Sequence, residues 1–182
     1  MNYKWWILVA ILLFGIGIGI GLATPSSIAS LLSEELTALA EFSGLLVPFK
    51  VSTMVLIFVR NAAAVILSFV FSPILCLLPV ITLSLNGWLL AFLSNVVIEQ
   101  KSLGFLLAGV LPHGIIELPA LIIGEAAALS FGAMAIVALF QKDRSTLILS
   151  SLRQNSKYVL LAVALLLPAA IIETYVTPLL VT

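Results

Sequence analysis

The sequence predicts an all-α, polytopic transmembrane helix bundle, and two observations carry this prediction. First, 63% of the 182 residues are hydrophobic and only 9% are charged, whereas roughly 25% of the residues in ordinary globular proteins are charged. So few charged side chains cannot cover a soluble protein, so lipid must cover most of the surface. Second, the apolar residues form runs of about 20, the length at which a helix crosses the membrane's ~30 Å hydrocarbon core. We therefore expect a single transmembrane domain, residues 1–182, in contact with membrane lipid.

The charge balance excludes a nucleic-acid-binding role. Lys and Arg together number 8, as do Asp and Glu, so the net charge is zero. No basic excess is left to neutralise phosphates. The single cysteine, Cys76, cannot form an internal disulfide or a CxxC metal or redox pair.

Four runs have the length and composition of uninterrupted spans. They are Trp5–Ala23, Phe49–Phe71, Ile74–Val97 and Tyr158–Val181. A signal peptide is an alternative for the first run, but that run is longer than the usual apolar core of 7–15 residues. We expect it to remain as a helix.

The run Leu103–Phe140 is too long for one ordinary span and contains Pro112, Gly114 and Pro119. Proline removes a helical hydrogen bond and fits best in the first turn of a helix. We expect a re-entrant half-helix, a break over residues 112–119, and then a full span. The bundle would then have five spans and one partial insertion.

The segment Ser26–Ser43 has apolar residues on one helical face and polar residues opposite, which predicts an interfacial amphipathic helix. It carries Glu34, Glu35 and Glu41 and no basic residue. One interpretation is an amphipathic linker, and the other is a docking surface for an extracytoplasmic protein partner.

Basic residues predict the orientation, because loops rich in Lys and Arg stay in the cytoplasm. The stretch Gln141–Lys157 carries four basic residues and one acidic residue, so we expect it inside the cell. Five crossings then place the N-terminus in the cytoplasm and the C-terminus outside. The protein would be a multi-pass protein of the cell membrane.

Small residues recur at helical spacing in two of the expected spans. Gly15, Gly17, Gly19 and Gly21 form two overlapping GxxxG patterns, and residues 120, 124, 128 and 132 are alternately Ala and Gly. Such stripes let helix backbones approach closely in lipid. The contact can be within one chain or between two, and a homodimer is the oligomer that we expect.

Polar side chains inside the expected spans are costly in lipid and need a partner or a function. We expect an intramembrane polar core formed by Arg60, Asn61, Asn86, His113, Glu117, Glu125 and Glu173. One guanidinium faces three carboxylates, so either a glutamate is protonated or a cation compensates. A packing network and a cation or proton site are both consistent with this composition.

His113 and Glu117 would share a helix face if the segment from Pro112 is helical. An HxxxE pair could ligate a metal jointly, but it lacks the second histidine of HExxH zinc enzymes. We favour a histidine that caps a helix. The sequence contains no pattern for catalytic, cofactor-binding or metal-binding residues, and an intramembrane hydrolase lacks an obvious nucleophile.

Several motifs together resemble the stage II sporulation protein M family of integral membrane proteins. They are Arg60-Asn61, Asn86-Gly87, the stretch Leu111-Pro-His-Gly-Ile-Ile-Glu-Leu-Pro-Ala120 with Gly124, and Pro168-Ala-Ala-Ile-Ile-Glu-Thr174 ending at Thr177-Pro178. Arg60-Asn61 departs from the paired asparagines that are frequent in the family.

The resemblance implies an all-helical membrane protein without enzymatic activity. In spore formers the family member works in engulfment and is similar to a scaffold for peptidoglycan-degrading partners. We therefore expect a non-enzymatic scaffold or partner-binding protein. The alternative is a small cation or proton channel or transporter that uses the same polar residues.

Overall fold

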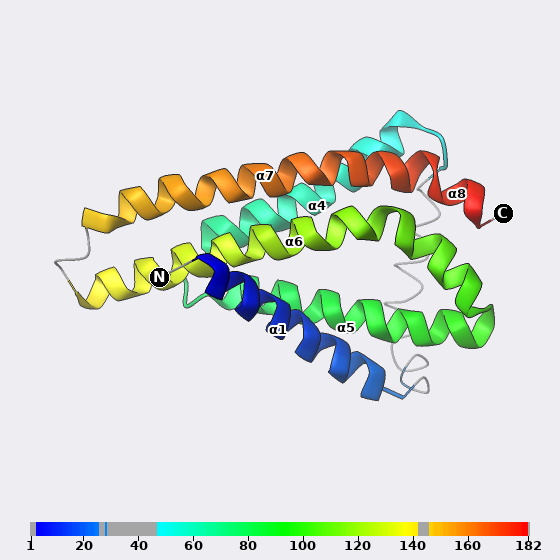
Figure 1. Ribbon diagram of the computed structural model, residues 1–182, viewed down its shortest axis with the longest axis horizontal. Coiled ribbons are helices and arrows are strands. Elements are labelled where there is room, and N and C mark those ends of the chain that lie inside the picture. The colour runs from blue at the N-terminus through cyan, green and yellow to red at the C-terminus, as the bar shows by residue number, and fades with distance from the viewer. Residues whose placement is uncertain (1–2, 26–27, 29–46, 142–145, 182) are drawn as a thin grey trace.

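The computed structural model describes residues 3–25, 28, 47–141 and 146–181, and all regular structure in these ranges is helical. The helices, shown in Figure 1, are α1 (Tyr3–Ala23), α4 (Val51–Phe71), α5 (Leu77–Gln100), α6 (Leu103–Phe140), α7 (Ile148–Tyr175) and the short α8 (Thr177–Leu180). The first five of these are long and apolar enough to cross a membrane. The predicted all-α polytopic bundle is confirmed. The expected interfacial helix, Ser26–Ser43, lies almost wholly outside the described residues.

Helix α6 is the centre of the bundle, because it contacts each of the other described helices. On one side it packs with α4 and α7 around Val65, Ala128 and Leu166. On another side it packs with α1 and α5 around Ala126 and Leu83. Neighbouring alanines of α6 therefore serve two separate cores.

Helix α1 packs on α5 through two of its four glycines. A Cβ on Gly17 would lie 2.2 Å from the carbonyl oxygen of Ser84, and one on Gly21 would lie 2.5 Å from that of Trp88. In return, a Cβ on Gly87 of α5 would lie 2.2 Å from the Phe14 carbonyl oxygen. The close approach of the two backbones thus requires glycine on both helices.

The glycine stripe of α6 is used within the chain. Ala120 and Ala128 are fully buried. A Cβ on Gly124 would lie 2.5 Å from Val65 of α4, and one on Gly132 would lie 2.4 Å from the carbonyl oxygen of Ser72. This stripe therefore packs against α4 and the turn that follows it.

The expected break in the fourth span is wrong. Helix α6 runs continuously through Pro112 and Pro119. In Figure 1 the ribbon of α6 changes direction in its green first part and is not interrupted there. Proline cannot donate to the carbonyls of Ala108 and Ile115, which explains a bend in this region. Gly114 does not interrupt the helix either, because it lies inside α6 and its φ is not positive. A Cβ added to it would lie 3.5 Å from Val110, an ordinary van der Waals contact, so glycine is not required there.

Three other expected boundaries differ from the structure. Helix α7 starts at Ile148, so Arg153 and Lys157 lie on an exposed helical surface and not in a loop. The last span ends at Tyr175, and residues 177–180 form the separate α8 with Pro178 in its first turn. The third span starts at Leu77, after a turn in which Leu75 and Cys76 have positive φ.

Candidate functional site

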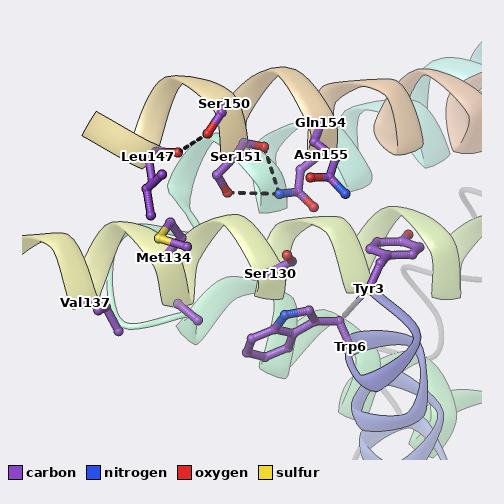
Figure 2. A pocket seen from close by; sticks show the side chains of 11 residues that line it. Tyr3, Trp6, Ser130, Met134, Val137, Leu147, Ser150, Ser151, Gln154 and Asn155 are labelled. Atoms are coloured by element: carbon purple, nitrogen blue, oxygen red, sulfur yellow. Dashed lines mark hydrogen bonds between the residues drawn. The ribbon is translucent and has the colours of Figure 1, made fainter. Parts of the chain in front are cut away.

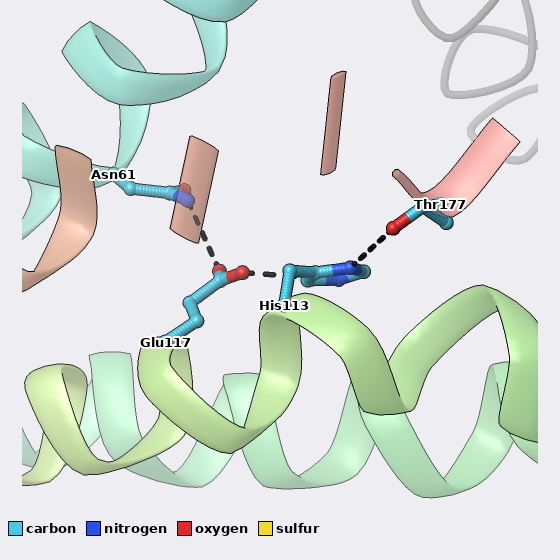
Figure 3. A network of polar contacts seen from close by, with 4 residues as sticks. All are labelled: Asn61, His113, Glu117 and Thr177. Atoms are coloured by element: carbon cyan, nitrogen blue, oxygen red, sulfur yellow. Dashed lines mark hydrogen bonds and ion pairs between the residues drawn. The ribbon is translucent and has the colours of Figure 1, made fainter. Parts of the chain in front are cut away.

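A polar network links α4 and α8 to α6, near the bend of α6 (Figure 3). The side-chain amide of Asn61 on α4 donates to Oε1 of Glu117 on α6 at 3.0 Å. One turn earlier on α6, Nε2 of His113 lies 3.9 Å from Oε2 of Glu117. Nδ1 of His113 lies 3.3 Å from the hydroxyl oxygen of Thr177 on α8. The continuous helix places His113 and Glu117 on one face, so His113 is an interior helical residue and not the cap that the sequence suggested.

Glu173 brings α7 into the same network. One side-chain donor atom each from His113, Glu117 and Glu173 can be chosen so that all three lie within 4.8 Å of one another. The carboxylates of Glu117 and Glu173 are close enough to repel each other electrostatically. All three side chains are partly buried, so they are partly shielded from solvent, and electrostatic interactions among them are stronger than in bulk water.

Arg60 on α4 interacts electrostatically with both Glu117 and Glu173. The residue itself is exposed on the outside of the bundle. It lies nine residues into α4, which corresponds to about 14 Å of helical rise. Arg60 therefore joins the network from its outer edge.

Glu125 does not belong to this network. It lies eight residues beyond Glu117 on α6, is fully buried, and accepts a hydrogen bond from the hydroxyl of Ser68 on α4. Within the described part of the chain, Oε1 of Glu125 has no hydrogen-bond partner. The interface between α4 and α6 thus includes a hydrogen bond from Asn61 to Glu117 and another from Ser68 to Glu125.

Asn86 is also separate from the network. Its amide donates to the carbonyl oxygen of Thr82 on its own helix at 2.7 Å, and the side chain is exposed. The next residue, Gly87, faces α1, and consecutive residues on a helix point about 100° apart. The packing of α5 on α1 therefore directs Asn86 away from the other polar groups.

Sequence reasoning missed Ser68, although a signal was present. Ser68 lies seven residues after Asn61, which is two helical turns, so the two residues share the face of α4 that meets α6. In the sequence, Thr177 stands out only as part of a family motif. Its contact with His113 depends on how α8 folds back on α6, which the sequence does not show.

A second polar region, also missed, lies at the opposite end of the α6–α7 pair (Figure 2). A pocket of about 230 Å³ is lined by Trp6, Ser130, Gln154, Asn155 and other residues. The amide of Asn155 donates to the carbonyl and hydroxyl oxygens of Ser151 at 2.9 and 3.2 Å. Tyr3 closes one side and donates to the carbonyl oxygen of Ile123 at 2.8 Å. These bonds hold α1 against α6 and arrange the wall of the pocket formed by α7.

The network at the bend of α6 offers an imidazole, two carboxylates, an amide and a hydroxyl group. Such a set can hold helices together, share a proton between carboxylates, or bind a cation. Its members come from four helices, so a change at the site would alter the packing of α4, α6, α7 and α8 together.

Comparisons with known proteins agree with the motifs. No curated protein and no solved structure matches the chain. The family model described as stage II sporulation protein M matches residues 9–178. This range includes α4, α5, α6 and α7, most of α1, and all residues of the polar network. The chain therefore belongs to the stage II sporulation protein M family and is a multi-pass membrane protein of that family.

Proposed function

We propose that the protein is a non-enzymatic membrane scaffold that forms a homodimer through α1 and binds partner proteins. The observation that carries this proposal is the difference between the two glycine pairs of α1. Gly17 and Gly21 are buried against α5, whereas a Cβ on Gly15 or Gly19 would meet no atom of the described residues within 4 Å. The second GxxxG pair is therefore open to another helix.

The open glycine pair lies within an exposed apolar face. Leu8 and Leu22 flank Gly15 at a spacing of seven residues, two helical turns, and are 54% and 59% exposed. Two copies that insert in the same orientation have parallel α1 helices. Parallel helices are the arrangement in which GxxxG pairs pack, and a two-fold axis would place the same face on both copies.

The polar contacts inside the bundle suit a scaffold because they join helices that are far apart in sequence. Asn61 joins α4 to α6, and His113 joins α6 to α8. In lipid, hydrogen bonds between helices stabilise one arrangement of the bundle. A bundle fixed in this way can present a constant surface to partners. We propose the acidic stretch with Glu34, Glu35 and Glu41, between α1 and α4, as the contact for an extracytoplasmic partner.

Cysteine cross-linking in native membranes tests the dimer. In a Cys76→Ala background, Leu22→Cys should form a disulfide-linked dimer on mild oxidation, because Leu22 lies on the open glycine face. Ile20→Cys is the matched control, because Ile20 is 56% exposed and lies at nearly the same depth as Leu22. The two residues are two positions apart in the helix, so Ile20 points almost opposite to Leu22. The Ile20→Cys variant should remain monomeric.

A second pair of substitutions connects the cross-link to the glycines. Replacing Gly15 and Gly19 by Leu should abolish the Leu22→Cys dimer without unfolding the chain, because both positions are open. Equal cross-linking at positions 20 and 22, or a Leu22→Cys dimer that survives both replacements, would contradict the proposed interface.

Cation or proton transport is a second candidate, favoured by the closeness of His113, Glu117 and Glu173. Reconstitution in liposomes tests it, with proton, monovalent and divalent cation flux measured for the native chain and for Glu117→Gln. The scaffold proposal predicts the same background flux for both. If the native chain shows a specific flux that Glu117→Gln loses, the scaffold proposal is wrong and the protein is a transporter.

A further inference from the structure

The side chains of His113, Glu117 and Glu173 converge from two helices. His113 and Glu117 lie one turn apart on α6, and Glu173 lies in the last turn of α7. One ring nitrogen of His113 and one carboxylate oxygen from each glutamate lie within 4.8 Å of one another. Because the two helices are packed along their length, this convergence is built into the bundle.

The imidazole of His113 is oriented by a hydrogen-bonding group behind it. Nδ1 lies 3.3 Å from the hydroxyl oxygen of Thr177, which can accept a hydrogen bond from Nδ1–H. Nε2 is directed to the other side, toward the carboxylate of Glu117 (Figure 3). Histidines that bind metals typically donate their second ring N–H to a neighbouring acceptor, which fixes the tautomer and presents the free nitrogen to the metal.

Glu117 is held in a similar way. Its Oε1 accepts from the amide of Asn61 at 3.0 Å, while Oε2 faces His113. Carboxylates that bind metals are also hydrogen-bonded by outer groups. Asn61 and Thr177 thus each hydrogen-bond to one of the donor residues, through atoms other than the Nε2 and Oε2 that face each other.

The size of the cluster is close to what a small cation requires. Zn²⁺ binds imidazole nitrogen and carboxylate oxygen at about 2.0–2.2 Å, so neighbouring donors in a tetrahedral site are about 3.3–3.5 Å apart. The observed limit of 4.8 Å must shrink by about 1 Å or more, which small rotations of the two glutamate side chains can provide.

The chemistry of the donors selects the kind of metal. Mg²⁺ and Ca²⁺ prefer sites built from oxygen alone, whereas an imidazole nitrogen suits Zn²⁺ and related transition metals. Two carboxylates and one neutral imidazole also balance the two positive charges of such an ion. The fourth position of a tetrahedral site would be filled by water.

We propose that His113, Glu117 and Glu173 form a binding site for one divalent transition-metal ion of the Zn²⁺ type, with Asn61 and Thr177 orienting the donors. The site joins α6 to α7 near the bend, where a metal would tie both helices together. This inference goes beyond both proposed functions, because binding of the ion requires neither a partner protein nor transport.

Zn²⁺ titration of the detergent-solubilised full chain, purified without a polyhistidine tag, tests the site. The native chain should bind one Zn²⁺ per chain by calorimetry. His113→Gln, Glu117→Gln and Glu173→Gln should each bind more than about tenfold more weakly, since each removes a donor. Glu125→Gln is the matched control, because Glu125 is a buried glutamate of the same helix outside the cluster; it should bind like the native chain.

Nuclear magnetic resonance of the native chain provides a test that does not depend on the variants folding. His113 is the only histidine, so labelled imidazole gives one pair of ring nitrogen signals. Zn²⁺ should shift the Nε2 signal and leave Nδ1 protonated. The proposal is overturned if the native chain binds no Zn²⁺, if the Nε2 signal does not respond, or if Glu125→Gln loses binding as strongly as the donor variants.

Discussion

At the scale of single residues, the contact between Ser68 and Glu125 shows how a buried polar group constrains its neighbours. Glu125 is fully buried, and one of its carboxylate oxygens has no partner within the described structure. Its hydrogen bond with Ser68 should therefore contribute more to the free energy of unfolding than an exposed hydrogen bond would. Leaving a buried acceptor unsatisfied costs about 1–3 kcal/mol, whereas losing an exposed bond costs much less.

Ser68→Ala should therefore lower the free energy of unfolding by about 1–3 kcal/mol, measured by thermal unfolding in detergent. Ser94→Ala is the control, because the Ser94 hydroxyl donates to the carbonyl oxygen of Leu90 on its own helix and its loss leaves no side chain of another helix unsatisfied. Glu125→Gln should have nearly the same free energy of unfolding as the native chain, because the amide has the same size and can still form a hydrogen bond with Ser68. Identical melting of the two serine variants would show that the buried bond contributes little.

The sequence predicted some of these residue positions and not others, for physical reasons. The helical spacing of His113 and Glu117 places them on one face wherever that helix packs. The isolation of Glu125 and the outward position of Asn86 depend instead on the rotation and depth of whole helices. Those are set by tertiary packing, which a hydropathy pattern does not contain.

At the scale of elements, the glycines of α1 and α5 determine how closely the two helices pack. The carbonyl oxygen of Ser84 occupies the space beside Gly17, and the Phe14 carbonyl oxygen occupies the space beside Gly87. Both obstacles are backbone atoms, which cannot rotate away as a side chain could. Any larger residue must separate the helices.

Gly17→Ala and Gly87→Ala should each destabilise the bundle by about 1–3 kcal/mol, the range for inserting atoms into a packed interface. Gly15→Ala, which places the same methyl group in open space on the same helix, should have little effect and can be slightly stabilising, because alanine is a better helix former than glycine. Melting temperatures of the three variants in detergent measure the difference. A Gly15→Ala variant as unstable as Gly17→Ala would mean that helix propensity and not packing is responsible.

The spans themselves were predictable because a helix that crosses lipid needs about 20 apolar residues, and four of the expected runs overlap the observed helices closely or in large part. The ends were less predictable. Pro112 and Pro119 suggested a break, but a proline inside a membrane helix is tolerated where neighbouring groups compensate for the lost hydrogen bonds. The start of α7 was missed because its first turns are polar, which composition alone cannot separate from a loop.

At the scale of the whole molecule, the two ends of the bundle differ in chemistry. Figure 1 shows the α6–α7 hairpin extending beyond the other helices at one end, while α8 and the C-terminus lie at the other. The 28 residues of α7 correspond to about 42 Å, longer than the ~30 Å hydrocarbon core. The exposed Arg153 and Lys157 lie near the start of this helix, where their charges can reach the membrane surface.

This asymmetry leads to a prediction for orientation. Basic residues near span ends favour the cytoplasm, so the hairpin between α6 and α7 should be inside and the C-terminus, five spans from the N-terminus, outside. In the Cys76→Ala background, Thr182→Cys should react with a membrane-impermeant maleimide in intact cells. Lys142→Cys should react only after the membrane is opened. If position 142 is labelled from outside and position 182 is not, the bundle is inverted, and the cluster of His113, Glu117 and Glu173 would lie toward the cytoplasm and take its ion from there.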